Sequence, residues 1–547
     1  MRNTISYINE QLYNTLVASK EILGGCSQEI SNCLDTAINK LNAPIQLAII
    51  GKISSSKSTL VNAILGASNI VATGKAELTY NVNWLKYGSL DDDIKIVFKD
   101  LTYDIKPRKE WTRLANRLSD EEAIENEELK QYIDKIKYIE VPYPSEILKY
   151  VNIIDTPGLY SYYRKDSENT ISFLKEVKPD AVIMLFTKSI LSEDMETLSK
   201  FQEKASETQR LFNLNPLNAI GMLAKMDECW KISEKKNPYS VCRRVIEDLK
   251  RENPILNTTF FEIQPISAML ALTSTFVKED FSLLSNLAKL DDDNIETMFK
   301  SKRHFLAGAG CITLTQEELK QLIGHYGLYG LYAIVTFFKQ HNSCLPEDLA
   351  LYLERISGFK QFRKILLAHF RDRAVLIKTQ NYVSEIIHTC EKVRNATNDI
   401  LTKELIDKVQ IKIMTMLMSI HEYAEWHYLA KIYNGDFNHL EKKMVEEYKV
   451  ICGENGNSVI DKLSLDPKCT VEDMRAKASE RASYWNIQYN VARIRKPKDA
   501  ELCKVMSESY KVLGQRIDEM AQKEKEANEI INMAHAFFMV NNNEYSC

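Results

Sequence analysis

The sequence lacks several features that mark common classes of protein. It has no run of 18 apolar residues, so we expect no transmembrane helix. Its start, MRNTISYINEQLYNTL, has no apolar core and no cleavage site, so we expect no signal peptide. A net charge of −4 gives no support for a nucleic-acid partner. The eleven cysteines show no C-x-x-C spacing, and we expect reduced thiols in a cytoplasmic protein.

Proline is scarce in the last third of the chain, where only two of 13 prolines follow Pro346. Residues 359–433 contain neither Pro nor Gly, and apolar side chains recur there mostly at steps of three, four and seven. This spacing predicts one long helical stripe. Two more helices are expected over residues 471–496 and from 500 to about 539. The chain therefore ends in a helical bundle or stalk, and residues 5–41 also have a helical pattern.

The first sign of a ligand site follows a short apolar run. LAII at residues 47–50 precedes GKISSSKST and then an amphipathic helical pattern. The pattern G-x-x-x-x-G-K-[ST] wraps backbone N–H groups around phosphates, with a Lys at the β/γ end and a hydroxyl on Mg²⁺. Ser56 replaces the second Gly of this P-loop pattern. An ordinary strand–helix turn is the alternative. The residues expected to contact nucleotide are Gly51, Ser54, Ser55, Ser56, Lys57, Ser58 and Thr59.

Three further motifs stand at the ends of predicted strands. Asp155-Thr156-Pro157-Gly158 follows an apolar run, and its Asp can hold Mg²⁺ through water while the N–H of Gly158 meets a γ-phosphate. Ala224-Lys225-Met226-Asp227 and Ser267-Ala268 follow two others, and an uninterrupted apolar run lies at residues 181–186. The pattern predicts an α/β domain with a mostly parallel sheet and a ligand site at the carboxyl ends of the strands.

The order and spacing of these motifs resemble those of GTPases. The resemblance implies that Asp227 accepts two hydrogen bonds from guanine, that Lys225 lies along the ring, and that the backbone after Ser267, at Ala268, contacts the guanine oxygen. Adenine offers no donor to such a carboxylate, so this set favours GTP over ATP. Ala224 departs from the family pattern, because it lacks the amide or hydroxyl that ties this loop to the P-loop.

The long segment between Ser58 and Asp155 resembles that of dynamin-like GTPases. Residues 71–82 are similar to their mobile switch, in which Thr79 would close over Mg²⁺ and position water, with Thr73 as a rival. The resemblance covers residues 45–270 and identifies the chain as a bacterial dynamin-like GTPase; a Leo-type, secretion-associated member is one candidate. It implies that the catalytic residues are Lys57, Thr79 and Ser54, and that the metal ligands are Ser58, Thr79 and Asp155.

Few side chains near these motifs could act as a base or place the attacking water for hydrolysis. None of the nine histidines precedes His304, which excludes a histidine base or zinc site from the nucleotide-binding motifs. Ile53 stands where dynamin-like proteins usually carry a polar residue that helps to place water. We therefore expect low basal GTPase activity that rises with assembly. The alternatives are a degenerate nucleotide-binding switch or scaffold with little hydrolysis, and a P-loop ATPase with a coiled-coil arm.

The predicted organisation has three segments. Residues 1–41 form a helical segment packed on the stalk, residues 42–345 a GTPase domain with a helical extension, and residues 346–547 a helical neck or trunk. The expected ligands are GTP or GDP with Mg²⁺. The expected partners are a second copy through the GTPase domain or a related dynamin-like protein, and the inner membrane as a peripheral contact. Candidate membrane tips lie at residues 433–437, near Gly453 and at 492–498, where a solvated helix end is the alternative.

Overall fold

The chain forms two compact units, and each is described by itself. In the computed structural model one unit is Asp35–His388, and the other combines Met1–Leu34 with Thr389–Cys547. These two units do not test the predicted division into residues 1–41, 42–345 and 346–547, which remains a prediction. The described residues are 2–51, 55–68, 70–71, 79–116, 118, 120–157, 173–174, 177–186, 217–234, 236–252, 256, 259–308, 314–341, 343–371, 373–433, 435–456 and 458–544.

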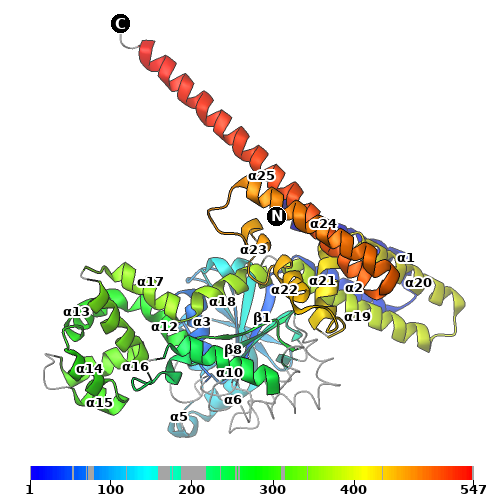
Figure 1. The fold of residues 1–547 in the computed structure, drawn as a ribbon. Helices are drawn as coiled ribbons and strands as arrows, with labels where there is room; N and C mark the ends of the chain where they lie inside the picture. Colours follow the sequence, from blue (N-terminus) through cyan, green and yellow to red (C-terminus); the bar gives the residue numbers. More distant parts are fainter. Residues whose placement is uncertain are drawn as a thin grey trace. The chain divides into compact units, whose positions relative to one another are not determined.

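Figure 1 shows the sheet of the unit Asp35–His388, with β1 and β8 labelled. Its strand order is β4-β3-β5-β2-β6-β1-β7-β8-β9. The pairs β1–β6, β1–β7, β2–β5, β7–β8 and β8–β9 are parallel, and the pairs β2–β6, β3–β4 and β3–β5 are antiparallel. This mixed, mostly parallel sheet confirms the predicted fold class. The strands are β1 (Ile45–Gly51), β2 (Val82–Tyr87), β3 (Ile94–Phe98), β4 (Tyr103–Lys106), β5 (Ile136–Tyr143), β6 (Val151–Asp155), β7 (Ala181–Phe186), β8 (Ala219–Leu223) and β9 (Ile263–Pro265).

The central strands are buried along their whole length, as uninterrupted apolar runs require when both faces of a sheet are covered. Every residue of β1, β6, β7 and β8 is buried. In the parallel register Ile49 of β1 pairs with Asp155 of β6, and Gly51 pairs with Leu185 of β7. The ends of β1 and β6 are therefore neighbours, which brings the P-loop beside the motif that begins at Asp155.

A helical extension follows β9 within the same unit and has its own hydrophobic core. Buried side chains of this core include Leu284, Phe299, Leu322, Tyr326 and Leu353. The extension meets the sheet domain through α12, which packs on α3, α16 and α17. The helices concerned are α3 (Lys57–Leu65), α12 (Ala268–Leu272), α13 (Val277–Leu287), α14 (Asp292–Met298), α15 (Lys302–Ala307), α16 (Gln316–Gln340), α17 (Pro346–Ile356) and α18 (Phe359–Ile365).

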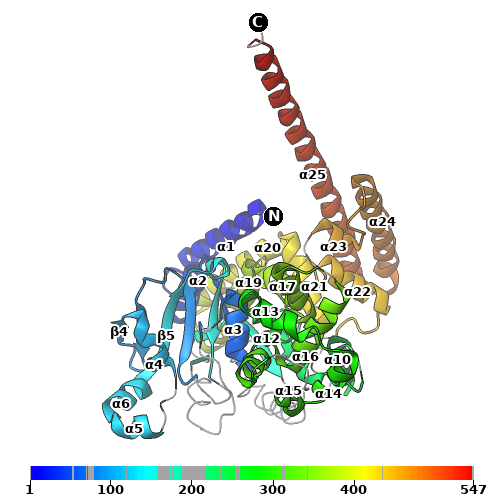
Figure 2. The same ribbon diagram turned by 90° about the vertical axis from the view of Figure 1, so that its left-hand side faces the viewer.

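The second unit is helical, which confirms the predicted helical stalk. Helix α24 packs along α25, and Figures 1 and 2 both show α25 continuing beyond α24. A partly buried ion pair joins α22 to α24. Glu447 accepts hydrogen bonds from Arg481 at 2.5 Å and from Trp485 at 3.0 Å. The helices are α1 (Arg2–Leu23), α20 (Ile400–Met418), α21 (His421–Tyr433), α22 (Lys442–Ile451), α23 (Val459–Leu463), α24 (Val471–Arg495) and α25 (Pro497–Glu544).

The prediction of one helical stripe over residues 359–433 is wrong. The stretch breaks into α18, a π-helical turn, α19 (Ala374–Ala396), α20 and α21. Asp399 begins α20 by accepting a hydrogen bond from the N–H of Thr402 at 3.0 Å, so a side-chain cap sets this break without Pro or Gly. The N-terminal pattern is likewise split, at Gly24 and Gly25, into α1 and α2 (Gln28–Leu41). None of the described helices has both the length and the apolarity of a bilayer-spanning segment.

Candidate functional site

Lys57, the first residue of α3, lies over the turn that follows β1. Its Nζ donates a hydrogen bond to the carbonyl oxygen of Gly51 at 3.1 Å, and the side chain is only 8% exposed. The ammonium is therefore held inside the P-loop turn rather than in solvent. A phosphate oxygen entering this turn would be a stronger acceptor than the carbonyl, because it is charged.

Three oxygen-bearing side chains meet beside Lys57. The Oγ of Ser58 lies 3.3 Å from Oγ1 of Thr79 and 3.3 Å from Oδ2 of Asp155. Asp155 is fully buried, and its Oδ1 has no hydrogen-bond partner among the described residues. Two hydroxyls and a carboxylate with an unsatisfied oxygen are hard ligands of the kind that Mg²⁺ prefers, so the residues fit this ion.

Burial raises the pKa of Asp155 to about 6, although the charge of Lys57 and the hydrogen bond from Ser58 oppose the shift. A carboxyl group with this pKa is costly to keep ionised without a cation close by. A bound divalent cation would supply that charge. The electrostatics and the geometry therefore agree on a cation site at the end of β6.

Thr79 reaches this cluster because the backbone around it is tied to α4 (Trp111–Ala115). Thr79 forms an isolated bridge with Asn116, and the N–H of Tyr80 donates to the carbonyl of Ala115 at 2.9 Å. The side chain of Thr79 is 9% exposed. This placement favours Thr79 as the switch residue, while its rival Thr73 lies outside the described residues, as do Ile53, Ser54 and Gly158.

The P-loop has one strained residue and one residue that must be glycine. Ser56 is in the left-handed region, with φ 68° and ψ 29°. A Cβ on Gly51 would lie 2.7 Å from Oγ of Ser55 and 2.8 Å from the carbonyl oxygen of Leu185. The Oγ of Ser55 is itself buried and without a hydrogen-bond partner among the described residues, which leaves it available to a ligand.

Two loops form the end of the site that the motifs assign to the guanine base, which we call the base end. Burial raises the pKa of Asp227, and a hydrogen bond with Ser267 acts in the opposite direction. Lys225 precedes Asp227 in a left-handed conformation, φ 56°, and its Nζ lies 3.4 Å from Glu228. Ser267 caps α12, whose first residue is the buried Ala268. The structure thus brings together the four residues that the motifs assign to guanine.

Residues 47–214 match the dynamin family. Over this segment the chain is similar to dynamin-like proteins. It is 24% identical to isoniazid-induced protein IniC of Mycobacterium tuberculosis over 462 residues, 83% of this chain and 86% of that protein. It is 27% identical over 155 residues to dynamin-like protein 2 of Campylobacter jejuni, which covers 28% of this chain and 22% of that protein.

Among solved structures, an oligomerised bacterial dynamin pair covers 97% of this chain and 78% of its own, at 16% identity and a TM-score of 0.32. A TM-score this low does not define a shared arrangement, so the likeness to dynamin-like proteins rests on the sequence matches.

Sequence reasoning missed the contribution of α16 and of the α17–α18 turn to the base end. A Cβ on Gly327 would lie 2.5 Å from Cε of Met269 and 3.8 Å from Oδ2 of Asp227. The N–H of Ser267 donates to the carbonyl of Ser357 at 2.9 Å. The sequence contained a signal, since GHYGLYG at residues 324–330 puts three glycines inside a helical pattern, which usually has a packing reason.

Proposed function

We propose that this dynamin-like protein binds GTP with Mg²⁺ and hydrolyses it to GDP and phosphate, slowly as a single chain and faster when chains associate. The observation that carries the proposal is the convergence of Ser58, Thr79 and Asp155 beside Lys57. Two hydroxyls, a buried carboxylate and a P-loop lysine are the parts that Mg²⁺-dependent hydrolysis of a nucleoside triphosphate uses.

Each residue then has a defined task. Lys57 neutralises charge at the β- and γ-phosphates, and Ser55 and the P-loop N–H groups hold the phosphate oxygens. Ser58, Thr79 and Asp155 would hold Mg²⁺, which neutralises charge that develops on the phosphates. Asp227 accepts the two guanine donors at the other end. In the reaction, water forms a bond to the γ-phosphorus, the bond to the bridging oxygen breaks, and the proton leaves with phosphate.

A second candidate is a guanine-nucleotide switch that turns over little GTP. The strained Ser56 favours it, because a Cβ in the left-handed region costs on the order of 1–2 kcal/mol. The alanine at position 224 also favours it, since its methyl group cannot tie the base loop to the P-loop. Turnover measured over a range of protein concentrations separates the two candidates. An ATPase is disfavoured by Asp227 with Ser267 at the base end.

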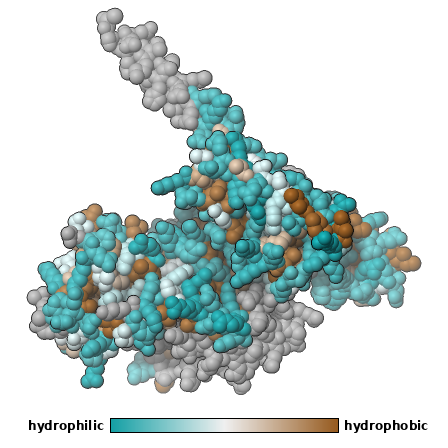
Figure 3. Space-filling model, viewed as in Figure 1, coloured by the Kyte–Doolittle hydropathy of each residue, from teal (hydrophilic) through white to brown (hydrophobic). Residues whose placement is uncertain are grey.

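We also propose that the turn between α24 and α25 contacts an anionic membrane surface. Ile494 is 87% exposed, and Ile487 and Val491 lie on the same side of α24 at helical spacing. Exposed basic side chains surround them at Arg493, Arg495, Lys496 and Lys498. Figure 3 shows apolar residues grouped on α24. At the rival tip Tyr433 and Phe437 are buried, so they offer no apolar surface.

The nucleotide assignment is tested by Lys57→Ala. GTP or GDP should raise the Tm of the parent chain, because a ligand that binds only the folded state stabilises it. The variant should lose this rise, since no other side-chain cation of the described residues is placed at the turn. Lys130→Ala, at an exposed lysine on α6 (Glu127–Lys135), is the matched control. A variant that GTP stabilises as much as the parent would show that the P-loop assignment is wrong. ATP in place of GTP tests the base preference.

A further inference from the structure

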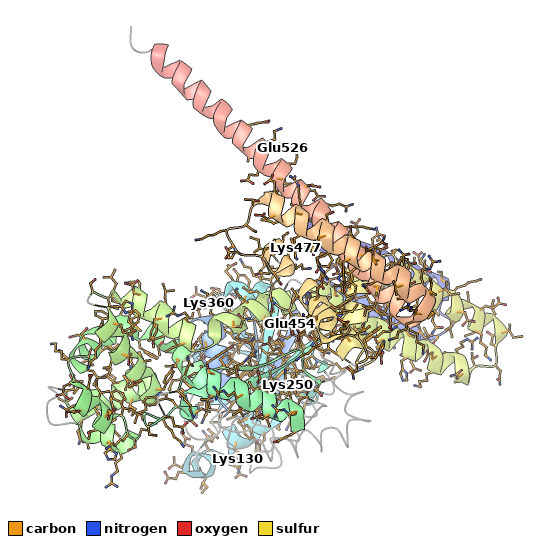
Figure 4. All side chains as sticks on the ribbon, in the orientation of Figure 1. Lys130, Lys250, Lys360, Glu454, Lys477 and Glu526 are labelled. Atoms are coloured by element: carbon orange, nitrogen blue, oxygen red, sulfur yellow. The ribbon has the colours of Figure 1, made fainter. Side chains whose placement is uncertain are left out.

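A cleft of about 780 Å³ lies among α16, α17 and α18, and no motif residue lines it. Its size is in the range of small-molecule sites. Four cationic side chains line the cleft, and Figure 4 labels one of them, Lys360. The lining cations are Arg355, Lys360, Arg363 and Lys364.

Three of these cations have no carboxylate partner within the described part of the chain. Arg363 lies 3.8 Å from Glu354, whereas Arg355, Lys360 and Lys364 form no ion pair with any residue that the structure describes. The other acidic lining residue, Asp348, is engaged by the N–H of Leu345 at 3.2 Å, where it caps α17. The cleft therefore holds positive charge that its own acidic residues do not offset.

An aromatic stack forms another wall of the cleft. Phe337 is stacked on Tyr352, with ring centroids 4.4 Å apart, and on His341 at 4.2 Å. The guanidinium of Arg355 lies 5.4 Å from the centre of the Tyr352 ring. This contact orders one cation before any ligand arrives, which lowers the entropic cost of binding.

We propose that this cleft, which we call the α17 cleft, binds a small ligand that carries clustered phosphate groups. Lys360 and Lys364 are four residues apart on α18, and Arg363 is next to them, so their charges share one side of the helix. Phosphates carry the charge density that such a group of cations recognises, and Arg and Lys are their usual ligands. The source is either a free polyphosphate, such as that of a nucleotide, or a phosphorylated lipid headgroup.

The α17 cleft is joined to the base loop by the short turn between α17 and α18. The carbonyl of Ser357 accepts from the N–H of Ser267, and a Cβ on Gly358 would lie 2.5 Å from the carbonyl oxygen of Pro265. Arg355 and Lys360 flank this turn in the sequence. A ligand that draws these two side chains together therefore acts on the backbone that supports Ser267.

The experiment uses the full chain with Lys57→Ala, so that the P-loop does not compete for the probe. Tripolyphosphate is titrated calorimetrically into this variant, and then into the same variant with Lys360→Ala and Lys364→Ala. The matched control instead carries Lys109→Ala and Lys130→Ala, two exposed lysines outside the cleft. We expect the cleft pair to weaken binding about tenfold, ~1.4 kcal/mol, and the control pair to leave it nearly unchanged.

Absence of tripolyphosphate binding in the Lys57→Ala chain would overturn the proposal, and so would equal losses in the two lysine pairs. Competition by ATP would identify a free polyphosphate as the source. Cleft-dependent binding to phosphatidylcholine vesicles only when they contain phosphatidic acid would identify a headgroup. None of these readouts depends on GTP binding at the P-loop, so a failure of the GTPase proposal would be seen separately.

Discussion

Ser56 adopts a backbone conformation that glycine takes without strain and serine does not. Its φ of 68° follows from its place at the end of the P-loop, where the chain must turn into α3. We predict that Ser56→Gly tightens GDP and GTP binding about tenfold, ~1.4 kcal/mol, measured by calorimetry. Ser464→Gly is the matched control, because Ser464 also has a positive φ, 53°, but lies in the helical unit. It should leave nucleotide affinity unchanged. Unchanged or weaker affinity in Ser56→Gly would mean that the serine hydroxyl contributes to binding.

Some residues of the site could be predicted from sequence motifs, and others could not. Lys57, Ser58 and Asp155 could be named from sequence because P-loop chemistry fixes their spacing. Gly327 and Ser357 could not, since they approach Asp227 and Ser267 from elements that begin more than 40 residues later in the chain. Nothing in a local pattern tells which distant backbone packs against a loop. Only the unusual glycines of α16 gave a hint.

At the scale of elements, the turn between α17 and α18 packs against the loop that carries Pro265 and Ser267. Gly358 has φ 78°, and its Cβ position is blocked by the carbonyl of Pro265 at 2.5 Å. We predict that Gly358→Ala displaces the loop that carries Ser267 and weakens GDP binding severalfold in a fluorescent-nucleotide titration. Gly66→Ala is the control, because Gly66 has φ 76° but nothing within 4 Å of its Cβ position. Equal effects of the two substitutions would exclude a specific role for the turn.

Helix α21 is fastened to α25 by a partly buried ionic cluster. His421 lies 3.3 Å from Glu425 and 3.0 Å from Ser509. Burial lowers the pKa of His421, but the hydrogen bond and charge of Glu425, with Glu422 and Glu508, outweigh it and raise the pKa above 6.5. Burial raises the pKa of Glu425, yet His421 and its neighbours lower it to about 2. Arg516 is also close, paired with Glu422 at 3.0 Å.

The sign of the resulting pH dependence follows from these shifts. The raised pKa of His421 stabilises the folded state below about pH 6.5, and this contribution is lost as pH rises through the folded value. The lowered pKa of Glu425 matters at acid pH. Its contribution to the free energy of unfolding is lost as the pH falls toward 2. We predict that the Tm falls as the pH rises above about 6.5, and that His421→Gln reduces this fall. An undiminished fall would contradict the assignment; His304→Gln, exposed in the other unit, is the control.

Helix boundaries show the limit of composition as a guide to elements. The absence of Pro and Gly over residues 359–433 predicted one helix, but a cap at Asp399 and a turn at Ser419 divide the stretch. In contrast, the ends of α24 follow the sequence well, because Thr470 caps it and Pro497 begins the next helix. Side-chain caps in polar stretches are common and leave a weaker signal than proline.

At the scale of the whole molecule, the chain joins a nucleotide-binding unit to a helical unit with an exposed apolar stripe. The parallel strands and their loop motifs made the first unit predictable, whereas the helical unit has no motif that states what it binds. We predict that GTP turnover per molecule is low in dilute protein and rises with concentration and with anionic liposomes, because association would order Thr79 and exclude water.

The membrane contribution is tested with Ile494→Glu, which places a carboxylate on the exposed stripe of α24 without disturbing the core, since Ile494 is 87% exposed. It should reduce both liposome binding and the liposome-dependent rise in turnover, because a carboxylate is repelled by anionic lipid and removes apolar contact. Ile400→Glu, at the first residue of α20, where the isoleucine is 74% exposed, controls for surface charge. Equal losses of liposome binding in both isoleucine variants would contradict a membrane contact at α24, because only the charge change is common to the two.

The assembly mechanism would be excluded by a high GTP turnover per molecule that does not change with protein concentration. No GTP turnover under any condition would favour the nucleotide switch.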